Sequence, residues 1–215
     1  MKTCVLLLWC CFFSAFCLAQ KNTYFLFDFG AAASGFQPES LLQEYTFKPY
    51  GSIHVRRELT YRTYFITGLA FQPKGMNISF IFEENPGDFS AGQQRLHLSY
   101  LSLPALVEFE FDYKDRNRLF YIQAGPFISI LLNDEWNIQE ASNFKEKTNI
   151  DARLDYGFAL GTGMGWFIGN RLVFNVRFRA EFGLKKINID NEFGELENAK
   201  TRNYPLTLGF EYSLK

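Results

Sequence analysis

The residues best placed to do chemistry are His97 and Ser99, which stand two positions apart. Side chains two apart on a strand share a face, so this His could activate this Ser as a nucleophile. Glu108 and Glu110 follow and could complete a His–Ser–Glu triad. However, Glu108 would lie about 30 Å further along an extended strand. Both glutamates are also an odd number of residues from Ser99 and point to the other face, so the motif lacks its acid.

A second pair, Ser52 and His54, has the same spacing and no evident acid. The glycine-rich segment 161–165 could suggest a phosphate loop, but it falls inside a predicted strand and no helix follows it. Neither segment therefore predicts an active site.

Metal and cofactor sites have little support in the sequence. The acids that could bind a cation stand in polar loop sequence, where carboxylates are usually solvated: Asp88, Asp134 and Glu135. All four cysteines lie within the first 17 residues, in a segment that we expect to be removed. We assign no catalytic residue, no cofactor-binding residue and no metal ligand, and we expect no cofactor.

The chain begins with the features of a secretory signal peptide. Lys2 supplies a positive charge, residues 5–13 are apolar, and Ala19-Gln20 is a suitable cleavage junction. We predict a signal peptide over residues 1–19 and one domain over residues 20–215. Beyond the signal, no apolar run approaches the roughly 18 residues of a membrane helix.

Residues 171–185 show the clearest two-residue period in the chain. One set is apolar throughout, and the alternate set is mostly polar or charged, including Asn175, Arg177, Arg179 and Glu181. A period of two places these sets on opposite faces of one strand. The segment is long enough to cross a bilayer, since a tilted spanning strand needs about 9–11 residues.

The same pattern recurs along the chain and predicts eight strands. They cover 22–33, 46–58, 61–82, 95–113, 118–133, 150–168, 171–186 and 201–214. Short connections alternate with long polar ones, the latter over 34–45, 83–94, 134–149 and 187–200. Outer-membrane barrels have short periplasmic turns and longer extracellular loops. The predicted fold class is therefore all-β, an eight-stranded antiparallel up-and-down transmembrane β-barrel.

In that fold the apolar face contacts lipid and the charges face the lumen. The predicted lumenal residues are Asp28, Lys48, His54, Arg56, Glu58, Glu108, Glu110, Asp112, Arg153, Asp155, Arg177, Arg179, Glu181 and Glu211. Buried charges need partners, so we expect a salt-bridged plug rather than an open pore. On the glycine-rich strand, the lumenal set is Gly157, Ala159, Gly161, Gly163 and Gly165, which suits a crowded, curved wall.

Several segments resemble the PorT-like outer-membrane β-barrel family of Bacteroidota. They are Thr67–Gly75, Tyr100–Val107, Ala124–Phe127 and Leu208–Tyr212, in the family's order and spacing. The resemblance implies an outer-membrane β-barrel over nearly the whole mature chain. The family's namesake is associated with the type IX secretion apparatus. We do not transfer that role, because most members have no assigned function.

The sequence thus favours a non-enzymatic structural or interaction role at the cell outer membrane, including an accessory role in secretion or surface assembly. The expected partners are outer-membrane lipid and envelope proteins that contact the long loops, where Phe89, Trp136 and Phe144 are candidate contacts. A nearly neutral charge argues against nucleic acid. Two alternatives stay open: a lipid-modifying enzyme resembling a lipid A deacylase, and a soluble periplasmic lipocalin-like carrier. The pattern defines no oligomeric state.

Overall fold

A computed structural model describes residues 22–37, 43–85, 88–112, 118–139, 145–146, 149–150, 153–191 and 194–214. Within these residues the long strands are β1 (Thr23–Gln37), β2 (Gln43–Thr60), β3 (Thr63–Asn85), β4 (Asp88–Asp112), β5 (Arg118–Gln139), β8 (Leu154–Phe167), β9 (Leu172–Gly183) and β11 (Gly194–Ser213). Three short strands accompany them: β6 (Lys145–Glu146), β7 (Asn149–Ile150) and β10 (Ile187–Asn191).

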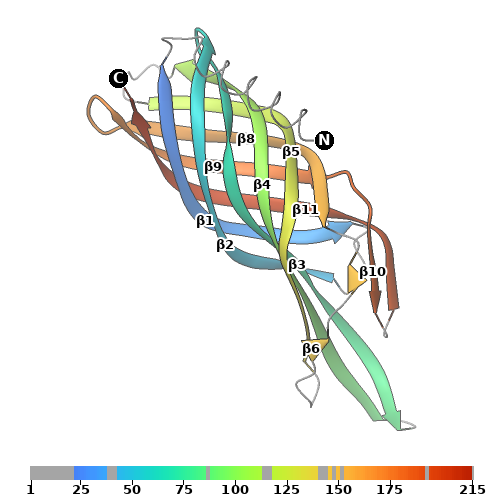
Figure 1. Cartoon of the computed structure of the whole chain (residues 1–215). Coiled ribbons are helices and arrows are strands. Elements are labelled where there is room, and N and C mark those ends of the chain that lie inside the picture. Colours follow the sequence, from blue (N-terminus) through green and yellow to red (C-terminus); the bar gives the residue numbers. More distant parts are fainter. Residues whose placement is uncertain are drawn as a thin grey trace, which may run out of the picture.

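The eight long strands of the described chain form one closed antiparallel barrel. Each pairs with the next in the order β1-β2-β3-β4-β5-β8-β9-β11, and β1 pairs with β11 to close the sheet. Closure leaves no free edge within the wall, because every strand has two neighbours. The predicted fold class and strand count are confirmed, and Figure 1 shows the strands wrapping around a common axis.

The two ends of the barrel differ. At one end, which we call the turn end, Tyr61 and Arg62 make a tight turn and residues 168–171 join β8 to β9. Arg62 and Gly169 adopt positive φ angles of 64° and 82° there. The first residue of β1 and the last of β11 also lie at the turn end, because Tyr24 pairs with Ser213.

The opposite end, the ribbon end, differs from the sequence prediction. The predicted loop over 83–94 is wrong, because β3 and β4 stay paired up to Asn85 and Asp88. Pairing of β2 with β3 stops at Ile78, and pairing of β4 with β5 stops at Gln93. Beyond these residues, β3 and β4 form a two-stranded ribbon that projects past the barrel (Figure 1).

The other predicted long loops are also partly strand. β1 runs on to Gln37, β5 runs on to Gln139, and β10 pairs with the first residues of β11. At this end only β8 and β9 are shorter than predicted. β8 begins at Leu154 rather than at residue 150, and β9 ends at Gly183 rather than at residue 186. Hydrogen-bonded strand pairing can continue there without alternation of apolar and polar residues, because beyond the bilayer neither face of a strand has to be apolar.

The faces of the wall have the predicted polarity. Alternate residues of β8, such as Leu154, Tyr156, Phe158 and Leu160, are 39–49% exposed on the outer side. Their neighbours face a lumen that holds buried charged residues such as Arg56, Glu108 and Arg177 beside buried apolar ones such as Ile66 and Leu106. This is the reverse of a soluble barrel, whose apolar face is turned inward. The lipocalin-like alternative is therefore wrong, since a soluble carrier would not expose large apolar side chains along the outer face of its wall.

Several predictions lie outside the described residues. They include the signal peptide over residues 1–19 and the contact residue Phe144. Phe89, Trp136 and Asp112 belong to β4 or β5 by backbone pairing, but their side chains are not described. Among the residues that the structure covers, no helix is long and apolar enough to cross a bilayer.

Candidate functional site

The charged lumen is the most distinctive part of the structure. Nine of the predicted lumenal residues are buried there: Asp28, His54, Arg56, Glu108, Asp155, Arg177, Arg179, Glu181 and Glu211. Lys48, Glu58 and Glu110 are half-buried. The prediction for Arg153 is wrong, because this residue precedes β8 and is exposed. Among the predicted residues whose side chains are described, alternation failed only at Arg153, where the strand had not yet begun.

Arg56 of β2 holds three carboxylates at the turn end of the lumen. Its Nε lies 2.7 Å from Oε1 of Glu108, its Nη2 lies 2.5 Å from Oε2 of Glu110, and its Nη1 lies 2.8 Å from Oε1 of Glu211. The guanidinium also lies 3.4 Å from the ring centroid of Tyr64. A planar group with five donors suits such a branched arrangement. Arg56 thereby ties β2 to β4 and β11.

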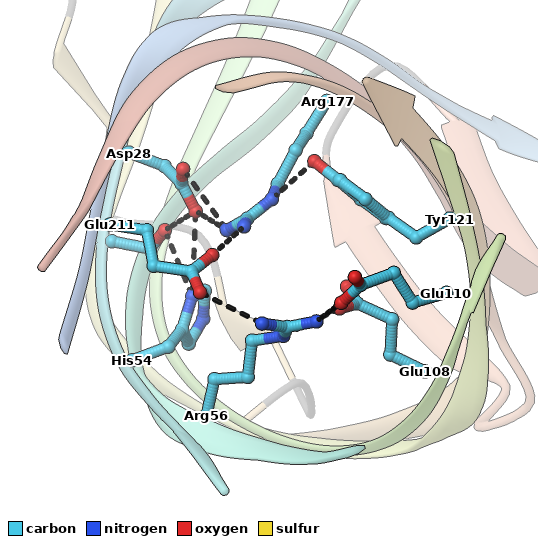
Figure 2. Close-up of polar contacts among 9 residues, drawn as sticks. Asp28, His54, Arg56, Glu108, Glu110, Tyr121, Arg177 and Glu211 are labelled. Atoms are coloured by element: carbon cyan, nitrogen blue, oxygen red, sulfur yellow. Dashed lines mark hydrogen bonds and ion pairs between the residues drawn. The ribbon is translucent and has the colours of Figure 1, made fainter. Parts of the chain in front are cut away.

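Arg177 of β9 makes a second bridge across the lumen. Its Nη1 lies 3.0 Å from Oδ2 of Asp28, its Nη2 lies 3.5 Å from Oε2 of Glu211, and its Nε donates to the Tyr121 hydroxyl at 2.7 Å. Glu211 is therefore shared by both arginines. Figure 2 shows the two guanidinium groups inside the barrel, with Asp28 and Glu211 on one side and Tyr121 and Glu110 on the other. These contacts connect β9 to β1, β5 and β11.

Two further layers follow toward the ribbon end. Glu181 accepts hydrogen bonds from Gln72 at 2.8 Å and Asn203 at 2.9 Å, and Arg179 donates to the Tyr50 hydroxyl at 3.0 Å. These contacts join β2, β3, β9 and β11 within a single layer. The lumen is thus bridged at successive levels, as the predicted plug requires.

The outermost layer is centred on Lys74, a residue that sequence reasoning left out of the lumenal set. Its Nζ lies 2.7 Å from Oδ2 of Asp155, which also accepts a hydrogen bond from Thr201 at 2.6 Å. The signal was present in the sequence, because Lys74 continues the even-numbered inward positions Ala70 and Gln72 of β3. A lysine buried in this way is balanced by its carboxylate partner.

The lumenal glycines of β8 leave space for side chains of the neighbouring strand. Gly163 pairs with Tyr121, and Gly161 pairs with Gln123. A Cβ atom at Gly163 would collide with the Tyr121 ring, and one at Gly161 would lie 2.6 Å from the Gln123 amide nitrogen. The predicted reason for these glycines, crowding in a narrow barrel, is confirmed at these positions.

This crowding predicts the effect of Gly163→Ala. The added methyl group displaces Tyr121 from Arg177, and overpacking of this kind costs about 1–3 kcal/mol. We expect a lower free energy of unfolding in urea titrations of the protein in lipid vesicles. The control is Tyr121→Ala, with and without Gly163→Ala. In the Tyr121→Ala background the glycine change should cost almost nothing, and an unchanged cost there would refute the explanation.

The structure supplies an acid for the Ser52–His54 pair, so the expectation that none is near is wrong. Asp28 pairs with Ser52 across β1 and β2. Its Oδ2 lies 3.6 Å from His54 Nδ1, and Ser52 Oγ lies 3.5 Å from the same nitrogen. A catalytic triad needs the acid and the nucleophile on opposite nitrogens of the imidazole. Here Nε2 has no hydrogen-bond partner among the described residues, and all three side chains are buried.

His97 and Ser99 alternate along β4 with the buried Leu96, Leu98 and Tyr100, and both are half-buried. Nδ1 of His97 contacts Nζ of Lys48. Glu108 lies in the lumen, bound to Arg56. Glu108 is therefore held by Arg56 at the turn end of the lumen, and it forms no triad with His97 and Ser99.

No group of His, Cys, Asp and Glu side chains in the described part of the chain is arranged to hold a metal ion. The lumenal side chains instead form ion pairs and hydrogen bonds with one another across the barrel. Their arrangement joins strands far apart in the sequence and fills the interior, as expected for eight strands. Chemically, it can close the lumen and stabilise the barrel.

Comparison with known proteins agrees with this geometry. A family model described as "Outer membrane protein beta-barrel domain" matches residues 19–188. The structure of the outer membrane protein OprG from Pseudomonas aeruginosa has a TM-score of 0.55 at 10% identity, over 90% of this chain and 97% of that one. Neisserial surface protein A has a TM-score of 0.49 at 11% identity, over 88% and 96%. No curated protein sequence matches the chain.

Proposed function

Because the chain belongs to the outer membrane protein beta-barrel domain family and is a β-barrel protein of the outer membrane, we propose that it acts there without catalysis, as a structural and interaction protein. The turn end then faces the periplasm and the ribbon end faces outward. We further propose that it belongs to the PorT-like group of Bacteroidota, on the segments named above, and that it assists secretion or surface assembly.

The observation that carries this proposal is the β3–β4 ribbon. The lumen is bridged by ion pairs at several levels, so the surface offered to other molecules lies outside it. Beyond Ile78 and Gln93, each ribbon strand has one paired neighbour among the residues that the structure describes. Unpaired strand edges are the backbone groups with which extended partner segments can pair. An envelope protein could therefore add a strand to this ribbon.

The ribbon can be tested by photo-crosslinking in cells. A photoreactive amino acid at Ser90, inside the ribbon, is expected to give discrete protein adducts. The same amino acid at Leu160, on the outer face of the barrel, should give none above background, because lipid surrounds it. If Ser90 gives no more adduct than Leu160 while the barrel is assembled, the interaction role is refuted.

A shortened variant separates the ribbon from the barrel. Replacing residues 80–92 with Asn-Gly joins the paired residues Ser79 and Gln93 through a two-residue hairpin turn. The barrel should still fold, as seen in unheated gels by the altered mobility of a folded barrel. The level of surface-displayed proteins should fall, because the strand edges offered by the ribbon are removed. Unchanged surface display would contradict the accessory role.

A further inference from the structure

β3 leaves the barrel wall before the ribbon begins. Its pairing with β2 is regular up to Phe71 and Gly51, then shifts register, and resumes at Met76 and Tyr45. Up to Phe71 the outward residues of β3 are exposed or half-buried, whereas all residues over 72–75 are buried. Alternate residues of a strand point to opposite faces, so both faces of β3 are covered by protein in this segment.

One face of this segment contacts β1, which is not its neighbour in the wall. Gly75 donates its backbone N–H to Ser34 Oγ at 3.0 Å, and Ser34 Oγ lies 3.5 Å from the Gly75 carbonyl oxygen. Ser34 is fully buried and belongs to the same lumenal face of β1 as Asp28 and Ala32. Because β2 separates β1 from β3 in the order of the sheet, β3 must pass on the lumenal side of β2 to make this contact.

The other face reaches across the lumen to β8 and β11. Lys74 Nζ lies 2.7 Å from Asp155 Oδ2 and 3.4 Å from Thr201 Oγ1. The ammonium group also lies 4.9 Å from the centroid of the Tyr100 ring and 5.2 Å from that of the Phe127 ring. This segment of β3 is therefore held from two sides, by β1 on one face and by β8 and β11 on the other.

β4 accompanies β3 through this region. Gln72 pairs with Tyr100, and Gly75 pairs with His97, so the two strands cross the end of the lumen together. Leu98 and Tyr100 are fully buried there. We call residues 72–75 of β3 and 97–100 of β4 the ribbon root, because the ribbon continues outward from them (Figure 1).

The ion pair is a directional contact among apolar ones. Burial of Leu98, Tyr100 and Phe127 stabilises the root, but apolar contacts are non-directional and allow more than one orientation. A buried lysine and a buried carboxylate must meet, because either charge is costly when it is left unpaired. Such a pair adds little net stability relative to apolar residues of similar volume. Its effect is therefore to select one arrangement of the root.

We propose that the Lys74–Asp155 ion pair and the Ser34–Gly75 contact are positioning contacts, which fix the direction in which the ribbon projects from the barrel. They lie on the two faces of the root, so together they oppose movement of the ribbon toward either side. A fixed direction presents the strand edges of the ribbon to a partner at one angle. That consequence rests on the proposed function, whereas the fixed direction itself does not.

The inner end of the root has a contact of its own. Gln72 donates a hydrogen bond to Glu181 at 2.8 Å. Loss of the positioning contacts would leave this hydrogen bond and the apolar packing in place. The barrel would then stay folded, while the ribbon beyond the root could take several angles.

The test measures distances between spin labels by pulsed electron paramagnetic resonance. The labels are attached to introduced cysteines, since the chain has no native cysteine beyond residue 17. A ribbon pair places labels at Ser90 and Leu160, and a wall pair places them at Ile53 and Leu160. Ile53 and Leu160 are exposed on the outer face of the barrel, at 56% and 49%. Both pairs are measured in barrels folded in lipid vesicles.

Two variants remove the positioning contacts separately. One carries Lys74→Met and Asp155→Leu, which replace both charges with apolar groups. The other carries Ser34→Ala. Gel mobility without heating shows that each barrel is folded. Because Ser34→Ala removes a single hydroxyl group, it tests the proposal even if the first variant does not fold.

We expect narrow distance distributions for both label pairs when the positioning contacts are intact. In each variant the distribution of the ribbon pair should become at least about twofold wider while that of the wall pair stays unchanged, because the ion pair selects an arrangement rather than stabilising the wall. A ribbon pair of equal width in all three proteins, or a wall pair that broadens as much, would overturn the proposal. The samples contain no partner protein, so this failure would leave the crosslinks from Ser90 in cells unaffected.

Discussion

Arg56→Met is expected to destabilise the barrel by about 3–5 kcal/mol, because it leaves buried carboxylates without their cation. Glu108 is fully buried, and Arg56 is the cation bound to its Oε1. Glu110 and Glu211 lose contacts of 2.5 and 2.8 Å at the same time. The measurement is the free energy of unfolding in urea, with the protein folded in phospholipid vesicles.

Two comparisons distinguish buried charge from general damage. Arg118→Met removes an exposed arginine near the turn end and should change stability by less than about 0.5 kcal/mol. Adding Glu108→Gln to Arg56→Met removes one uncompensated charge, so the double variant should be more stable than the single one. If Arg56→Met costs less than about 1 kcal/mol, the lumen is hydrated enough to screen its carboxylates, and the plug is not a structural element.

The faces of the barrel wall were predictable because hydrocarbon and lumen impose opposite demands on alternate residues. In β9 the two alternating sets match the observed faces, with Asn175, Arg177 and Glu181 inward, and Val173 is the apolar residue among the inward positions. The strand order also follows from the sequence, because consecutive strands joined in hairpins must pair. Fold class, strand number and lumenal residues were therefore accessible from the pattern.

The partners of the lumenal charges were not predictable in the same way. Arg56 binds Glu211, 155 residues away, because barrel closure brings β2 and β11 to opposite sides of β1. The level at which two side chains meet depends on the stagger of the strands, which the two-residue period does not encode. For the same reason the proximity of Asp28 to Ser52 was missed, although both were recognisable as inward residues.

The ribbon was missed for a different physical reason. Two-residue alternation indicates a strand only where the two faces of that strand lie in different environments. Beyond the bilayer, both faces of a strand contact water. The sequence over 83–94 therefore resembles a loop, although its backbone is paired.

That stripe gives the second large prediction: Leu160→Lys should cost roughly 2–4 kcal/mol in vesicles, the cost of a lysine on the lipid face near the bilayer midplane. Leu160 lies midway along β8, pairs with Ala124 and Ala180, and is 49% exposed. Leu184 is similarly exposed at 56%, but it follows the last residue of β9 at the ribbon end of the barrel. Leu184→Lys should therefore cost only about 0–1 kcal/mol.

The contrast between these two positions depends on depth in the membrane, because both leucines are exposed to a similar degree. In a water-soluble barrel, two partly exposed leucines would tolerate lysine equally well, since the charge would be hydrated at either site. Urea unfolding of both variants in the same vesicles measures the difference directly. Equal costs at Leu160 and Leu184 would contradict a hydrocarbon layer centred on the middle of β8.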